Sequence, residues 1–202
     1  MPPKLLFLPG VSGDPTFWQP VGERLPASWS KVYLGWPGMG HQPPDPAVSS
    51  FDDLVNLAAA ELPAAVIAQS MGGIVAVRLA LNHPTRIPRL VLVATSGGVD
   101  VARLGAADWR PEYRQNFPNA APWITDTRPD HTREIRGIVT PTLLIWGDRD
   151  PISPVAVGKH LSHLLPDARL AIVAGGTHSM AREQPAPVAA LIVEHLAALG
   201  AG

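Results

Sequence analysis

The sequence predicts an α/β fold: a mostly parallel sheet of about six strands with helices on both faces. Short apolar runs recur along the chain, each followed by a turn and a helical pattern, and this alternation is typical of a parallel sheet covered by helices. Apolar residues make up 46% of the chain and charged residues 16%, which suits strands buried on both faces. The length of 202 residues fits one such domain.

The strands are predicted from short apolar runs, each of which ends near Gly, Ser or Asp. Runs of this length with flanking turn residues are typical of buried strands. The predicted strands are residues 5–8, 32–34, 65–68, 90–94, 142–146 and 170–173.

Helices are predicted between these strands from their start and stop residues. Ser50 followed by Asp53 resembles a capping box, with Asp as a shorter replacement for Glu. Residues 71–82 carry apolar side chains at helical spacing and stop before Pro84, because proline disfavours helix at the preceding residue. The last helix is predicted at residues 186–199.

Residues 97–139 interrupt this alternation. The segment is rich in Pro, Trp, Asp and Arg and has neither the period of a strand nor that of a helix. Irregular connections of this length are uncommon in compact domains and often form lids or binding loops. We therefore expect one domain over residues 1–202 with a short cap or lid insertion at about 97–139. A surface excursion without such a role is the alternative.

Composition excludes several classes of function. A formal net charge of −1 and a pI near 6.6 leave no basic excess for nucleic acid or an anionic membrane. Without cysteine there is no disulfide and no thiolate nucleophile. The apolar run at residues 5–8 is too short for a membrane span or a secretory signal, so we expect a cytoplasmic location. No pattern predicts the oligomeric state.

The most informative motif follows the predicted strand 65–68. Ala68, Ser70 and Gly72 form a small-x-Ser-x-Gly turn that leads directly into a helix. Such a nucleophile elbow holds the serine in a strained conformation above the sheet edge, and its neighbours must be small so that strand and helix can approach. A helix cap is the alternative role for Ser70.

A serine nucleophile needs a base, and the base needs a carboxylate that fixes its tautomer. Asp148 and Asp150 follow the predicted strand 142–146 and lie at the same sheet edge as Ser70. We assign Asp150, which stands deeper in the turn, and expect Asp148 to accept loop amides as an Asx turn. His178 follows the last strand in a Gly-Gly-Thr-His loop, whose glycines allow the imidazole to reach the elbow.

Other side chains are predicted to line the pocket around this site. His41 follows a Gly-Met-Gly turn and is a candidate. Four other histidines have weaker contexts: His83, His160, His163 and His195. Aromatic residues in loops are as often core anchors as pocket walls. The predicted wall residues are Trp18, Met39, Trp109, Tyr113, Phe117 and Trp123.

The chain order Ser70, Asp150, His178 is the order associated with the α/β-hydrolase fold. The sequence resembles the α/β-hydrolase superfamily over nearly its whole length. It is similar to a serine esterase-like member with a shortened cap. The motifs that carry the resemblance are residues 8–10, 17–18, 36–40, 68–72, 84–91, 141–154, 176–178 and 183–185.

The resemblance implies an α/β-hydrolase fold that lacks the first two strands of the family sheet. It implies an oxyanion hole formed by the backbone N–H groups of Val11 and Met71, although the family often has His-Gly where this chain has Pro9-Gly10. The implied reaction is hydrolysis of small to medium apolar acyl esters through an acyl-enzyme, without a metal or an organic cofactor.

The expected partner is a small-molecule ester, with no nucleic acid and no membrane span. The elbow surroundings look like those of carboxylesterases that act on carrier-linked methyl esters. One triad serves several reactions on this fold, so thioesterase, lyase and C–C bond hydrolase activities remain alternatives. A non-catalytic ligand-binding protein is a further alternative.

Overall fold

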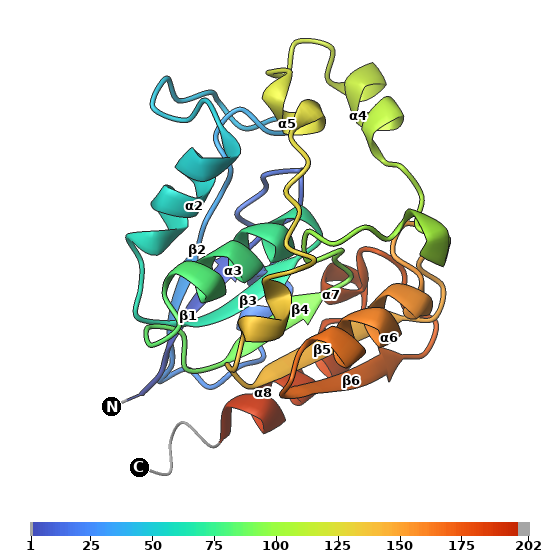
Figure 1. Cartoon of the computed structure of the whole chain (residues 1–202). Helices are drawn as coiled ribbons and strands as arrows, with labels where there is room; N and C mark the ends of the chain where they lie inside the picture. Colours follow the sequence, from blue (N-terminus) through green and yellow to red (C-terminus); the bar gives the residue numbers. More distant parts are fainter. Residues whose placement is uncertain (1, 198–202) are drawn as a thin grey trace.

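The computed structural model describes residues 2–197 and contains one parallel sheet (Figure 1). Within this range six strands pair in the order β2-β1-β3-β4-β5-β6, and every neighbouring pair is parallel. The predicted fold class is confirmed. The strands are β1 (Lys4–Leu8), β2 (Ser30–Tyr33), β3 (Ala65–Gln69), β4 (Leu90–Val93), β5 (Thr142–Gly147) and β6 (Ala168–Val173).

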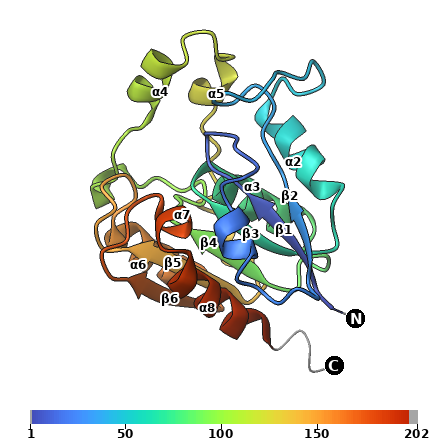
Figure 2. The ribbon, with the colours of Figure 1, turned by 180° about the vertical axis from the view of Figure 1, so that it is seen from behind.

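Helices cover both faces of the sheet, and side chains that alternate along each strand pack against one layer or the other. In β3, Val66 and Ala68 belong to one apolar core, whereas Ala65 and Ile67 belong to the second. On the first face (Figure 1) lie α2 (Phe51–Ala59), α3 (Met71–Asn82) and α6 (Val155–Leu164). On the second (Figure 2) lie α1 (Gln19–Gly22), α7 (Met180–Glu183) and α8 (Pro185–Leu196).

The two edge strands are longer than predicted. β2 begins at Ser30 rather than at residue 32, and β6 begins at Ala168 rather than at residue 170. Their added residues are not fully buried, because an edge strand is covered on fewer sides, and an apolar run therefore underestimates its length. In the interior, β4 ends at Val93 because Ala94 has a positive φ of 47°.

The predicted capping box at α2 is present, with one difference. Ser50 Oγ accepts a hydrogen bond from the N–H of Asp53 at 3.2 Å. The Asp53 carboxylate accepts from the N–H of Ser49 at 2.9 Å instead of from that of the cap residue. α3 covers the predicted residues 71–82. The end predicted for the last helix, residue 199, lies outside the described residues.

Residues 97–139 contain two short helices rather than a purely irregular loop. α4 (Arg110–Asn116) and α5 (Trp123–Asp126) stand away from the sheet at the top of Figure 1, with 3-10 turns at Ala102–Leu104 and Ile135–Gly137. The Tyr113 hydroxyl accepts a hydrogen bond from the N–H of Gly40 at 3.0 Å. The segment is therefore tied to the loop that follows β2.

Candidate active site

Ser70 lies in a strained turn between β3 and α3, as the motif predicts. Its backbone has φ 53° and ψ −120°, and its side chain makes no helix-cap hydrogen bond. A Cβ added at Gly72 would lie 2.4 Å from the carbonyl oxygen of Pro9, so only glycine fits there. The strand, the turn and the helix are packed too closely for a larger residue, which fixes the direction of the Ser70 side chain.

Asp150 and His178 form a direct pair at the same edge of the sheet. Asp150 Oδ2 lies 2.8 Å from His178 Nδ1, and the Asp150 side chain is fully buried. Asp150 Oδ1 accepts from the N–H groups of Ile152 at 2.8 Å and Ser153 at 3.0 Å. A carboxylate can only accept, so Nδ1 of His178 carries the proton and Nε2 is left as an acceptor.

The role expected for Asp148 is corrected in part. Asp148 does accept a loop amide, but the amide is that of Gly175, 27 residues further on, at 2.6 Å. It therefore joins two loops instead of forming an Asx turn. The Asx-type bond belongs to Asp150, through the N–H of Ile152. The two loops are in backbone contact, because a Cβ added at Gly147 would lie 2.1 Å from the carbonyl oxygen of Gly176.

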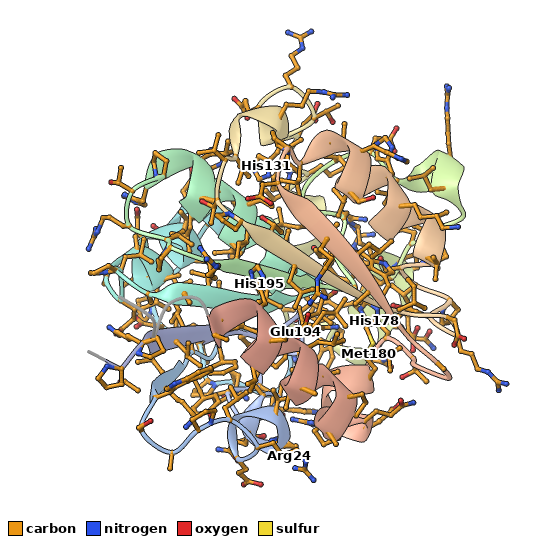
Figure 3. The ribbon with its side chains drawn as sticks, turned by 90° about the horizontal axis from the view of Figure 1, so that it is seen from below. Arg24, His131, His178, Met180, Glu194 and His195 are labelled. Carbon is orange, nitrogen blue, oxygen red and sulfur yellow. The ribbon has the colours of Figure 1, made fainter. Side chains whose placement is uncertain are left out.

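Ser70 and His178 line one cavity of about 430 Å³, a size typical of small-molecule sites. His178 reaches the cavity from the loop between β6 and α7. Figure 3 shows His178 beside Met180. Asp150 stays behind His178 and does not line the cavity. Segments at 98–102, 106–110 and 128–130 also line the cavity.

Two backbone donors lie next to Ser70. Among residues 2–197, neither the N–H of Val11 nor that of Met71 donates to a backbone carbonyl outside the regular helices and strands. The loop before Val11 lies against the serine, because a Cβ added at Gly10 would be 3.2 Å from Ser70 Cβ. These are the two N–H groups that the family resemblance implies for an oxyanion hole.

Side chains not identified from the sequence hold this arrangement in place. Trp36 Nε1 donates to the carbonyl of Pro9 at 2.8 Å, which fixes the loop that carries Val11. Thr95 Oγ1 donates to the carbonyl of Ser70 at 2.5 Å, and Gln69 Nε2 donates to that of His178 at 3.1 Å. Gln69 is the variable position of the elbow motif, and the motif gives no indication of these long-range contacts.

The predicted pocket walls are only partly correct. Trp109 lines the cavity with Ser70. Trp18, Met39 and Tyr113 do not, because they are buried in the core at 1%, 1% and 5% exposure. The other three predicted residues line a second cavity of about 540 Å³ between the loop after β2 and the α4–α5 connection; they are His41, Phe117 and Trp123.

Comparison with known proteins identifies the family. A profile of the alpha/beta hydrolase family matches residues 5–131. The chain belongs to this family. A second profile, described as TAP-like protein, matches residues 107–199. No helix within residues 2–197 has both the length and the apolar character needed to cross a bilayer.

Family relatives resemble the chain over most of its length. A pimeloyl-(acyl-carrier protein) methyl ester esterase of Neisseria meningitidis is 24% identical, with 87% of this chain and 86% of the relative covered. The enzyme of the same name from Aromatoleum aromaticum is 28% identical, with 94% and 96% covered. The solved structure of a thermophilic esterase from Thermogutta terrifontis has a TM-score of 0.73 at 22% identity and covers 95% of this chain and 88% of that one.

Proposed function

We propose that this hydrolase cleaves carboxylic esters through an acyl-enzyme formed on Ser70. The observation that carries the proposal is the 2.8 Å pair of Asp150 and His178 beside a cavity that Ser70 and His178 both line. The pair leaves His178 Nε2 free to accept the proton of a serine hydroxyl. The names of the curated relatives, which are methyl ester esterases, support the ester as substrate.

In the proposed reaction, His178 Nε2 takes the proton of Ser70 while Oγ attacks the ester carbonyl. The N–H groups of Val11 and Met71 donate to the oxyanion that develops, and Asp150 stabilises the imidazolium. The imidazolium then protonates the leaving alcohol. Water, deprotonated by the same histidine, releases the acid and restores the serine.

The substrate side of the proposal is an ester with a small to medium apolar acyl group. Apolar side chains such as Ile74, Val99 and Trp109 line the cavity. Segment 97–139 acts as a short cap in this proposal, because its residues 98–102, 106–110 and 128–130 line the same cavity as Ser70. Carrier-linked methyl esters belong in the substrate panel, given the names of the relatives.

The test compares two serines of the same cavity. Ser70→Ala is expected to lower kcat on p-nitrophenyl butyrate by at least about 10³-fold, whereas Ser96→Ala, also in the cavity wall, keeps kcat within about threefold. Intact mass after treatment with a fluorophosphonate, followed by peptide mapping, should find the adduct on Ser70. A Ser70→Ala variant with full turnover, or an adduct on another residue, would refute the assignment.

A further inference from the structure

His131 is fully buried and takes no part in the chemistry proposed above. Its ring Nδ1 lies 3.1 Å from the carbonyl oxygen of Gly97, and its Nε2 lies 3.0 Å from Nε of Arg78. The arginine Nε–H can only donate, so Nε2 accepts and the ring proton sits on Nδ1, where it donates to Gly97. The ring is thus a neutral imidazole with both nitrogens bonded.

His131 and its two partners, Gly97 and Arg78, come from different parts of the chain. Gly97 and Gly98 open the segment that contains α4 and α5, and the N–H of His131, near its far end, donates to the carbonyl of Gly98 at 2.8 Å. Arg78 belongs to α3, the helix that begins directly after Ser70. Figure 3 shows His131 on the side of the sheet opposite to α8. One side chain therefore fastens both ends of the segment to α3.

The fit at this junction requires glycine. Gly98 has a φ of +80°, and a Cβ added to it would lie 2.4 Å from His131 Nδ1. The junction also rests on the core, because the carbonyl of His131 accepts from the N–H of Ile135 at 2.9 Å and Ile135 is fully buried.

Both chain ends that meet at His131 continue into the wall of the cavity. Gly98, Val99 and Asp100 line it on one side of the junction, and residues 128–130 line it on the other. Loss of the His131 bonds would therefore free two segments that line the same cavity as Ser70.

We propose that His131 is a positioning residue that clamps the two ends of segment 97–131 onto α3 and so holds the wall of the ester cavity, and that protonation of its ring opens this clamp. The catalytic test of this proposal rests on the proposed function, whereas the clamp itself does not depend on it. A protonated Nε2 is a donor and faces the Nε–H of Arg78, so one hydrogen bond becomes a contact of two donors and two positive charges.

The charged groups around the ring shift the pKa of His131 in opposite directions. Burial, together with the charge of Arg78, holds the pKa of His131 below its ordinary value, whereas the carboxylates of Glu134 and Asp130 favour the protonated ring. Asp130 Oδ1 is engaged by the N–H of Thr132 at 2.9 Å. The clamp is therefore closed at neutral pH and opens on the acid side.

Two substitutions of His131 separate its bonds. His131→Gln places an amide oxygen where Nε2 accepts from Arg78 and cannot titrate. His131→Asn keeps a donor near the Nδ1 position but loses the bond to Arg78. His163→Gln, at an exposed histidine of α6, is the matched control. A fourth variant, Arg78→Gln, removes the guanidinium that donates to Nε2 of the ring.

The catalytic test measures kcat and KM for p-nitrophenyl butyrate from about pH 5 to 8. In the wild type and in His163→Gln, KM should rise about tenfold on the acid side, as expected for loss of one charge-assisted hydrogen bond. In His131→Gln, KM should stay flat over the same pH range. In His131→Asn and in Arg78→Gln, which both lose the hydrogen bond between Arg78 and the ring, KM should be raised at every pH.

Hydrogen exchange of peptides from residues 97–131 tests the clamp without any substrate. After correction for the intrinsic rate, wild-type exchange should increase on acidification and that of His131→Gln should not. A wild-type KM that does not change with pH, or exchange that is the same in both proteins, would overturn the proposal. If the exchange behaves as expected but Ser70→Ala keeps full esterase activity, the proposed function fails and the clamp stands.

Discussion

Asp150→Asn tests the proposed chemistry at the atom that sets the tautomer of His178. In the wild type, Asp150 Oδ1 accepts from the N–H groups of Ile152 and Ser153, and Oδ2 pairs with His178 Nδ1. The asparagine oxygen must occupy the Oδ1 place, because both of those partners are donors. The amide nitrogen then faces Nδ1 and donates to it.

The consequence is a histidine with its proton on the wrong nitrogen. His178 Nδ1 becomes an acceptor and Nε2 carries the proton, so the ring cannot act as base for Ser70. A tautomer error of this kind lowers kcat about 10⁴-fold, or about 5 kcal/mol of transition-state stabilisation. The free energy of unfolding should change by only about 1 kcal/mol, because both loop bonds are kept.

The assay is steady-state hydrolysis of p-nitrophenyl butyrate at about pH 7.5, with urea unfolding as the check on the fold. Asp148→Asn is the matched control: it keeps an acceptor for the N–H of Gly175 and should retain kcat within about tenfold. If Asp150→Asn kept wild-type kcat and Asp148→Asn lost it, the carboxylate of the triad would be Asp148.

Two predictions concern stability. Gly72→Ala places a methyl group against the carbonyl oxygen of Pro9 at 2.4 Å, and urea denaturation should show a loss of about 1 to 3 kcal/mol or more; an unchanged midpoint would contradict the close packing of the elbow. In the folded chain, burial lowers the pKa of both His131 and His195 below the ordinary value of 6.5. The unfolded chain therefore binds more protons, and the free energy of unfolding should fall as the pH decreases below about 7. Urea midpoints at about pH 7.5 and 5.5 measure this, and His131→Gln should reduce the difference between them.

Much of the fold follows from local patterns. The six parallel strands, the capped start of α2 at Ser50 and the strained turn at Ser70 were all predictable, because apolar runs, caps and small-residue turns act over a few neighbouring residues. The edge strands were predicted too short, since their residues lack the apolar character of the interior ones. The candidate triad followed from its order along the chain and the places of its residues after strands.

The sequence by itself determined the α/β class and predicted the elbow and the candidate nucleophile, base and carboxylate. Only the tertiary structure decided which side chains meet across the sheet: Asp148 with the N–H of Gly175, Trp18 and Met39 in the core, and His131 between Gly97 and Arg78. The physical reason is the separation in sequence between the residues that interact. Strands, caps and turns depend on neighbours in sequence, whereas burial and hydrogen-bond partners between distant residues arise only when the layers pack.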